Sequence, residues 1–163
     1  MLIKVKNKDT LLFDDFIFRC VVGKKGISEK KTEGDFCTPR GSFNLKTVYY
    51  RSDRVKNIKT KLNIKKIKRG MGWCNDPKDK KYNSLINING KIKHEKLYRK
   101  DNKYDIIIVI DYNLRKPIPF KGSAIFIHIT KNFSGTAGCI ALSKKDLLIL
   151  LKLVNKKTKI KIF

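Results

Sequence analysis

The sequence predicts a mainly β protein of the α+β class with a few short helices, one of which follows a cysteine in the C-terminal third of the chain. Two observations support this fold class. Six segments of five to eight residues are rich in β-branched and aromatic residues. Only one stretch, which begins near residue 143, has apolar residues at the spacing of an amphipathic helix.

The expected strands are distributed along the whole chain. The first alternates apolar and charged residues, a pattern typical of an edge strand with one buried face. Turn-forming residues are present at 23–26 and 38–41, and residues 113–120 hold two prolines and are expected to form a loop. The six strands are expected at residues 2–6, 16–22, 42–49, 104–111, 123–129 and 157–162.

The expected helix begins at a capping signal. Ser143 followed by Asp146 resembles a capping box in which aspartate replaces the usual glutamate. The residues that follow form a broad apolar face, made of Leu147, Leu148, Leu150, Leu151 and Val154. We expect this face to pack against the sheet near Cys139.

The composition indicates one globular domain over residues 1–163, because 41% of the residues are apolar and the chain is long enough to bury a core. Lysine and arginine total 39 against 14 acidic residues, which gives a net charge of +25. Such a charge is typical of proteins that bind polyanions. Only seven of the basic residues are arginine and the charge is spread along the chain, so we favour a solvated surface that also attracts peptides with several carboxylates.

The cysteines give no sign of a metal site. They lie at positions 20, 37, 74 and 139, without a C-x-x-C pair or the spacing of a zinc site. The N-terminal segment lacks the apolar core of a signal peptide, and no apolar run is long enough to span a membrane. The expected location is therefore the cytoplasm, where thiols stay reduced, or the periplasm if the N-terminus is truncated.

Cys139 is the candidate nucleophile. It ends a run rich in small residues at 133–139, and His128 lies eleven residues upstream on an expected strand. A free thiol has a pKa of about 8.5 and needs help from a base such as histidine to act as a thiolate near neutral pH. Backbone N–H groups of small residues can turn toward an oxyanion. Each residue alone could be an ordinary core residue, but their order along the chain favours acyl transfer through a thioester.

Residues 56–103 are polar and lysine-rich and are expected to form an elaborated loop. Trp73 in this region could line a pocket or anchor the loop, and the sequence does not decide between these roles. His94 and Glu95 could form a second acid–base pair, although we favour an ordinary surface role for them.

Two motifs point to a known family. Residues 38–43 read Thr-Pro-Arg-Gly-Ser-Phe, and His128 is followed by Gly138-Cys139-Ile140. These stretches resemble the Thr-Pro-x-Gly-x-Phe segment and the histidine and Gly-Cys-Ile/Val elements of the L,D-transpeptidase catalytic domain family, also called YkuD domains. The resemblance covers nearly the whole chain. A branch of the family that often lacks an export signal is similar at residues 70–77, 94–99, 104–113 and 136–151.

This resemblance implies a β-sandwich or barrel of the YkuD type and a reaction on peptidoglycan stem peptides. By similarity, Cys139 attacks the carbonyl between an L-centre and a terminal D-residue, typically D-alanine, while His128 serves as base and then as acid. The implied oxyanion hole consists of backbone amides of Ala137, Gly138 and Cys139. No cofactor is expected in this chemistry.

The chain departs from the common family pattern beside the cysteine. Many members read Ser-His-Gly-Cys-Ile/Val-Arg, whereas this chain reads Thr-Ala-Gly-Cys-Ile-Ala at residues 136–141. The alanine at position 141 cannot bind a carboxylate, so another residue must do so or the contact is missing. The candidates for substrate binding are Thr136, Arg54, Trp73 and His94. The sequence does not identify the group that orients His128.

Four functions follow from these observations. We expect an L,D-carboxypeptidase that trims tetrapeptide stems in cell-wall recycling, because the family motifs are present and no export signal is seen. The first alternative is an L,D-transpeptidase that forms crosslinks. The others are a basic nucleic-acid-binding module, which the diffuse lysine charge does not favour, and a degenerate fold that binds stem peptides without cleaving them. The sequence does not indicate the oligomeric state.

Overall fold

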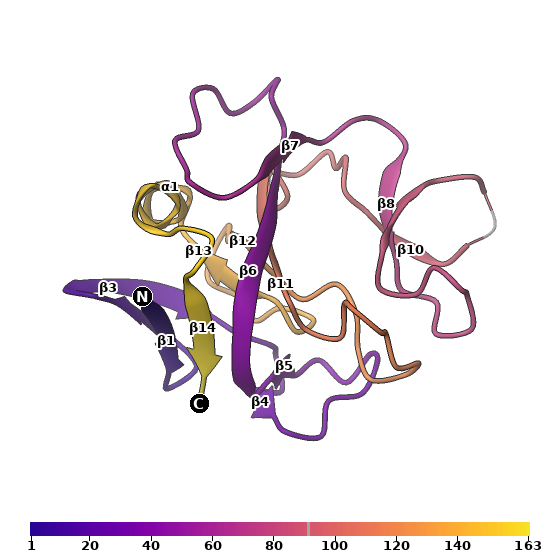
Figure 1. Ribbon diagram of the computed structural model, residues 1–163, viewed down its shortest axis with the longest axis horizontal. Coiled ribbons are helices and arrows are strands. Elements are labelled where there is room, and N and C mark those ends of the chain that lie inside the picture. Colours follow the sequence, from indigo (N-terminus) through magenta and orange to yellow (C-terminus); the bar gives the residue numbers. More distant parts are fainter. Residues whose placement is uncertain (91) are drawn as a thin grey trace.

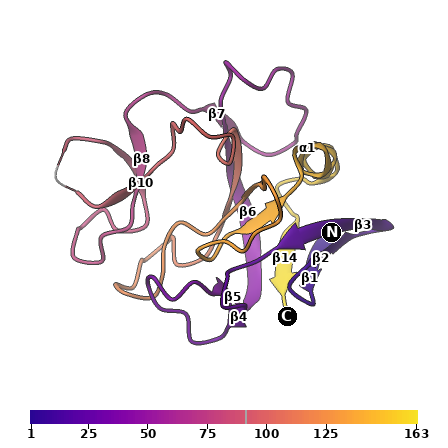
Figure 2. The same cartoon turned by 180° about the vertical axis from the view of Figure 1, so that it is seen from behind.

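Eight strands form a closed barrel in the computed structural model, which describes residues 1–90 and 92–163 (Figures 1 and 2). Their order around the barrel is β11, β12, β13, β3, β2, β1, β14 and β6, and a direct pairing of β6 with β11 closes the ring. The eight strands are β1 (Leu2–Lys6), β2 (Thr10–Phe13), β3 (Phe16–Val21), β6 (Gly41–Tyr50), β11 (Ile106–Ile110), β12 (Phe126–Ile129), β13 (Ile140–Leu142) and β14 (Lys159–Ile162). The expected mainly β barrel is confirmed.

The two ends of the chain meet in this barrel. Strand β1 pairs in parallel with β14, with Ile3 opposite Ile160 and Val5 opposite Ile162. All four of these side chains are buried, while the residues between them point outward. The pairing supports the proposal that residues 1–163 form one domain.

Strands β11 and β12 are buried on both faces, which explains their unbroken apolar sequences. Successive side chains of a strand point to opposite faces. On β11, Ile106, Ile108 and Ile110 join the main core cluster. Ile107 and Val109 join a second cluster on the other face, which we call the outer cluster and which includes Trp73, Phe126 and Cys139. Cys139 therefore lies on the outer face of the barrel.

A small sheet provides part of the outer cluster. It is antiparallel, with the order β10, β8, β9, and its strands are β8 (Met71–Cys74), β9 (Leu85–Asn87) and β10 (His94–Lys96). The expectation of an elaborated loop over residues 56–103 was thus partly wrong, since this segment holds the small sheet and β7 (Ile64–Lys66), which pairs with β6. A further short pair joins β4 (Ile27–Ser28) to β5 (Thr38–Pro39).

The helix α1 (Lys144–Leu153) begins at the expected cap. The Ser143 hydroxyl accepts a hydrogen bond from the Asp146 N–H at 3.1 Å and donates to the Asp146 carboxylate at 2.7 Å. Leu147, Leu150 and Leu151 are fully buried in the main core cluster. The described part of the chain contains no helix with the length and apolar character needed to cross a membrane.

Two strands of the barrel were missed, and three begin two or three residues later than expected, namely β11, β12 and β14. Strand β2 follows a tight turn at Asn7 and Lys8, both with positive φ, and this turn lacks the glycine that usually signals a hairpin. Strand β13 is only three residues long. Strand β12 begins at Phe126 rather than at residue 123, because Ala124 has a left-handed φ of 53° that interrupts extended structure.

Candidate active site

Cys139 and His128 are placed by neighbouring parallel strands. Strand β12 pairs with β13 so that Ile127 faces Ile140 and His128 faces Ala141. Cys139 immediately precedes β13 and therefore lies beside Phe126, whose N–H donates to its sulfur at 3.4 Å. Because side chains alternate along a strand, Phe126 and His128 point to the same face as Cys139. The sequence expectation that these two residues come together agrees with this arrangement.

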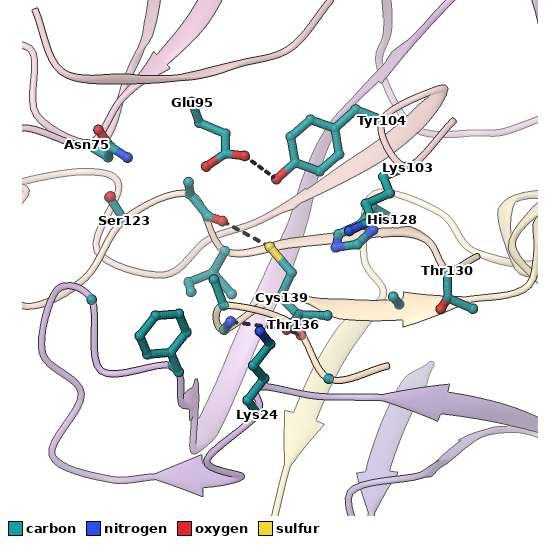
Figure 3. A pocket seen from close by; sticks show the side chains of 18 of the residues that line it. Lys24, Asn75, Glu95, Lys103, Tyr104, Ser123, His128, Thr130, Thr136 and Cys139 are labelled. Atoms are coloured by element: carbon teal, nitrogen blue, oxygen red, sulfur yellow. Dashed lines mark hydrogen bonds between the residues drawn. The ribbon is translucent and has the colours of Figure 1, made fainter. Parts of the chain in front are cut away.

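A cavity of about 480 Å³ opens over this face (Figure 3). Its wall includes Cys139 and His128, the loop at residues 123–125, and Glu95 of the small sheet. This volume is in the range of pockets that enclose small ligands. The cavity therefore gives a short peptide access to the thiol.

The thiol of Cys139 is protonated at rest. The residue is 7% exposed, and its Sγ donates to the Ala124 carbonyl oxygen at 3.2 Å. Burial raises the pKa of Cys139 to about 12, and the hydrogen bond from the Phe126 N–H opposes this rise. At neutral pH the thiolate must therefore form by proton transfer to a nearby base.

His128 is placed to be that base. Its Nδ1 lies 2.8 Å from the Ile129 carbonyl oxygen, and burial lowers the pKa of His128 to about 4. A neutral ring whose Nδ1 faces a carbonyl must carry its proton on Nδ1 and donate it, which leaves the lone pair of Nε2 free. The orienting group that the sequence could not identify is therefore the Ile129 carbonyl. Among residues 1–90 and 92–163, no hydrogen bond joins His128 to Cys139.

Tyr104 packs against the histidine ring. The two rings are 5.3 Å apart between centroids, at 72°, and the Tyr104 hydroxyl donates to Glu95 at 3.1 Å. Burial raises the pKa of Tyr104 well above its ordinary value, so the hydroxyl stays protonated. Arg99 stacks on the same ring at 5.1 Å and lies 3.4 Å from Glu95. Tyr104 was not assigned a role from the sequence, because an aromatic residue at a strand end is usually a core residue.

The loop before Cys139 is braced by Thr136. Its hydroxyl donates to the Cys139 carbonyl at 2.6 Å and accepts from the Gly138 N–H at 3.0 Å. The Gly138 N–H is therefore occupied, and the expectation that it belongs to an oxyanion hole needs correction. No hydrogen bond of the Ala137 or Cys139 N–H is found in the described part of the chain, so these two amides remain the proposed donors. Thr136 lines the cavity, but its hydroxyl is engaged by the loop itself.

Thr38, from the Thr-Pro-Arg-Gly-Ser-Phe motif, also holds the loop before Cys139 in place. Its side chain is fully buried, and its hydroxyl accepts from the Gly23 N–H and donates to the Gly138 carbonyl, each at 2.8 Å. Gly138 has a φ of 142°, and a Cβ there would lie 2.9 Å from the Cys37 carbonyl oxygen, so only glycine fits. The motif thus positions the loop that carries Cys139, a role that the sequence did not reveal.

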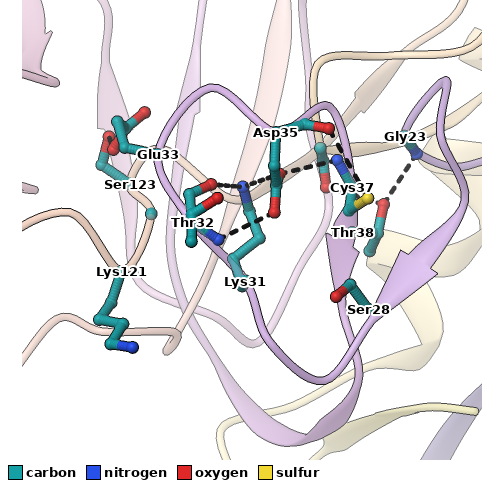
Figure 4. A network of polar contacts seen from close by, with 12 residues as sticks. Gly23, Ser28, Lys31, Thr32, Glu33, Asp35, Cys37, Thr38, Lys121 and Ser123 are labelled. Atoms are coloured by element: carbon teal, nitrogen blue, oxygen red, sulfur yellow. Dashed lines mark hydrogen bonds and ion pairs between the residues drawn. The ribbon is translucent and has the colours of Figure 1, made fainter.

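A polar network shapes the neighbouring wall of the cavity (Figure 4). The Asp35 carboxylate accepts from the Lys31 ammonium at 2.5 Å and from the backbone N–H groups of Thr32 and Cys37, each at 2.9 Å. The Lys31 hydrogen bond and the two backbone hydrogen bonds lower the pKa of Asp35 although partial burial opposes them. These bonds join residues of one segment, so the network fixes the conformation of residues 31–37.

Replacing Thr38 with valine is expected to destabilise the protein by about 1–3 kcal/mol, because it leaves two buried backbone groups without partners. The melting temperature should fall by several degrees, and peptide cleavage should slow because the Gly138 carbonyl loses its anchor. Thr158→Val is the matched control. Thr158 is also fully buried and bonded to backbone, by the Asn155 N–H, but it lies in the turn after α1. Equal loss of activity in both folded variants would contradict the bracing role of Thr38.

Three expected substrate-binding residues lie outside the cavity wall. Arg54 binds Asp105 at 3.0 Å and two carbonyls of residues 100–101. Trp73 is 5% exposed, donates to Asn83 at 2.9 Å and packs on Phe126, so it anchors the outer cluster. The His94 ring lies at 2.6 Å from the Ile92 carbonyl and against Gly72. These assignments were wrong because none of the three side chains lines the cavity. Arg54 and Trp73 are bound by residues 10 to 51 positions away, which the local sequence does not reveal, and His94 is bound by its near neighbour Ile92.

The cavity is strongly basic. Two carboxylates, of Glu33 and Glu95, line it. The basic lining residues are Lys24, Lys31, Lys93, Arg99, Lys103 and Lys131. Its field attracts carboxylates and opposes the entry of ammonium groups. Within the described ranges, no three His, Cys, Asp or Glu side chains are grouped to hold a metal ion.

Comparison with protein families gives one match. A family model for the L,D-transpeptidase catalytic domain (YkuD) matches residues 2–162, almost the full length. Searches of curated proteins and of solved structures gave no match. The matched region includes every residue of the site described above.

Proposed function

The chain belongs to the L,D-transpeptidase catalytic domain family, and on this premise we propose that it is an L,D-carboxypeptidase that removes the terminal D-residue from tetrapeptide stems. The family acts through a cysteine on peptidoglycan peptides. The observation that carries the proposal is the pairing of β12 with β13, which brings the Cys139 thiol and the free Nε2 of His128 to one cavity. The cytoplasmic location remains a prediction.

In the proposed acylation, His128 Nε2 accepts the thiol proton and the sulfur attacks the carbonyl carbon before the D-residue. The N–H groups of Ala137 and Cys139 stabilise the oxyanion. When the tetrahedral intermediate collapses, the C–N bond breaks and the protonated histidine gives its proton to the leaving amine. The low pKa of His128 favours this transfer, because a buried imidazolium is a strong acid.

In the proposed deacylation, His128 removes a proton from the water that attacks the thioester carbonyl. The C–S bond then breaks, the peptide leaves with a new carboxyl group, and the protonated histidine returns its proton to the sulfur. Transpeptidation would need a second stem peptide whose amine arrives as an ammonium ion. The excess of basic residues in the cavity wall opposes that cation but not neutral water. This difference favours hydrolysis over crosslinking.

We propose that Lys24 takes the place of the missing family arginine. Its backbone N–H donates to the Thr136 carbonyl at 2.9 Å, which ties it to the loop of the nucleophile. Its side chain lines the cavity (Figure 3), and its ammonium group lies 6.0 Å from the centre of the Phe36 ring in the same wall. An ammonium group there is suited to bind the carboxylate of the terminal D-residue.

Lys24→Met is expected to raise the KM for a tetrapeptide by about tenfold, the effect of one lost charge-assisted contact, with a smaller change in kcat. Lys25→Met is the matched control, since Lys25 is the adjacent exposed lysine and does not line the cavity. Steady-state kinetics on both variants test the assignment. A similar KM for Lys24→Met and the unaltered protein would show that Lys24 does not bind the substrate carboxylate.

The reaction itself is tested by incubating the pure protein with a tetrapeptide stem, with and without a tripeptide acceptor, and measuring products by mass. We expect tripeptide and D-alanine in both mixtures. If crosslinked dimer were the only product, the activity would be that of a transpeptidase and not that of a carboxypeptidase. No release of D-alanine in either mixture would contradict both reactions and favour a binding protein without activity.

A further inference from the structure

The carbonyl that holds the resting thiol belongs to a residue in a strained conformation. Ala124 has a φ of 53°, a left-handed value that non-glycine residues rarely adopt. It lines the cavity, and its carbonyl oxygen lies 3.2 Å from Cys139 Sγ, the contact that ends at the sulfur in Figure 3. Such strain persists only where surrounding contacts enforce it, and it is often found at functional sites.

The side chain of Asn83 holds Ala124 in this conformation. Its side-chain oxygen accepts from the Ala124 N–H at 3.0 Å and from Trp73 Nε1 at 2.9 Å. Its amide nitrogen donates to the carbonyls of Tyr112 and Asn113 at 3.0 and 2.6 Å. Asn83 is 2% exposed, so all four bonds of this buried amide are made to protein groups. The four contacts hold the side chain in one orientation and thereby hold Ala124.

The direction of the Ala124 carbonyl affects the chemistry of the thiol. A hydrogen bond from S–H to a carbonyl stabilises the neutral thiol and disfavours the thiolate. The same bond directs the proton toward Ala124, whereas attack on a peptide requires that the proton pass to His128 Nε2. Ala124 and His128 therefore compete for one proton.

We propose that Asn83 is a positioning residue that holds the Ala124 carbonyl against Cys139 and so adds to the effect of burial in retaining the thiol proton until a peptide occupies the cavity. This inference rests on the proposed role of Cys139 as nucleophile, but it concerns the resting enzyme. A peptide N–H that donates to the Ala124 oxygen would weaken its hold on the thiol proton. Binding of the peptide would then free the thiol proton for transfer to His128.

Other groups that titrate also face Cys139. They are His128 on β12, Tyr104 before β11, Glu95 on β10, and Lys24 and Lys31 in the loops on the opposite wall. His128 and Tyr104 are both neutral near pH 7 because both are buried. A comparison of variants at Asn83 leaves all five groups in place, so it isolates the effect of the Ala124 carbonyl.

The experiment measures alkylation of each cysteine by iodoacetamide between pH 6.5 and pH 9, with peptide mass spectrometry and without any stem peptide. In Asn83→Gly, the Cys139 rate is expected to rise about fivefold at each pH, as the loss of one weak hydrogen bond predicts. Glycine tolerates the φ of 56° found at Asn83. Because no peptide is used, failure of the carboxypeptidase assay does not affect this test.

Asn113→Gly is the matched control. Asn113 has a similar φ of 53° and its side chain makes three hydrogen bonds to loop backbone, at Ile118 and Gly122, but none to Ala124. Its backbone carbonyl, which accepts from Asn83, is retained in glycine. Its Cys139 rate should equal that of the unaltered protein. Equal rates in all three proteins, or the same rise in both variants, would overturn the proposal.

The other cysteines distinguish a specific effect from unfolding. The half-buried Cys37 should react at the same rate in the unaltered protein and in each variant. The buried Cys20 and Cys74 should stay unreactive while the fold is intact. If Asn83→Gly exposes Cys20 and Cys74, Trp73→Phe decides the question. That variant keeps an aromatic ring packed on Phe126 but removes the Nε1–H donor to Asn83. We expect the alkylation rate of Cys139 to rise about two- to threefold, because Asn83 is loosened but not removed. An unchanged Cys139 rate in folded Trp73→Phe would then overturn the proposal.

Discussion

Cys139→Ala is expected to reduce D-alanine release from a tetrapeptide stem to background, a loss on the order of 10⁴-fold or more, because no other group can form the thioester. The fold should survive, since the change removes one sulfur atom from the outer cluster and leaves its aromatic packing intact. Release is measured by mass and folding by the melting temperature. A mass increase equal to the acyl group should be trapped in the unaltered protein only.

Two other cysteines provide the controls for this variant. The first control is Cys37→Ala. Cys37 lies in the loop next to Gly138, but its sulfur faces the Asp35 carbonyl at 3.7 Å and does not line the cavity. Cys74→Ser changes a buried residue on β8. Both should retain D-alanine release in proportion to their folded fraction. A loss at Cys74 as large as at Cys139 would show that the nucleophile is misassigned.

His128→Gln is expected to lower the rate by about a hundredfold or more, the usual effect of removing a general base. Glutamine can still fill much of the space and form hydrogen bonds, but it cannot accept the thiol proton. His94→Gln is the control, because the chain has only two histidines and His94 lies outside the cavity wall. Equal rates for the two variants would remove His128 from the mechanism.

The pH dependence separates a base from a merely structural histidine. With His128 neutral above a pKa of about 4, the rate of acylation should be nearly constant through neutral pH and fall only in acid. In His128→Gln the reaction depends on free thiolate. Because the pKa of Cys139 is about 12, its residual rate should rise about tenfold per pH unit between pH 6 and pH 9. Parallel pH profiles would contradict the assignment.

The same group makes stability depend on pH. The pKa of His128 is about 4 in the folded protein and about 6.5 in an unfolded chain, so the unfolded chain binds more protons between these values. The free energy of unfolding should therefore decrease as the pH falls from 6.5 to 4, on the order of 1 kcal/mol per pH unit from this residue. Urea unfolding of His128→Gln should lack this contribution.

The predicted fold rested on local patterns, and most of it is confirmed. Alternation at residues 2–6 specified β1, and the Ser143 cap specified the start of α1. Local signals failed where they were short or absent, as for the three residues of β13. They also failed in residues 56–103, where the small sheet depends on pairing between segments whose own sequences are polar.

The sequence by itself indicated the class of chemistry and pointed to Cys139 and His128 as the proposed reacting residues, because a thiol after small residues and a histidine on the preceding strand have few other combined uses. It could not determine their state. Only the tertiary structure decided that the Ile129 carbonyl orients His128 and that Ala124 holds the thiol proton. It also showed that Lys24 and Tyr104 line the cavity beside Cys139, whereas Arg54, Trp73 and His94 do not.

The physical reason is the range of the contacts. Strand and helix signals depend on residues a few positions apart, whereas the bonds that set the site join distant segments, such as Thr38 to Gly138 across 100 positions and Asn83 to Ala124 across 41. Burial, which sets the protonation of Cys139 and His128, is likewise a property of the folded barrel and its covering sheet. The reacting groups are thus specified locally, while their reactivity is set by the fold.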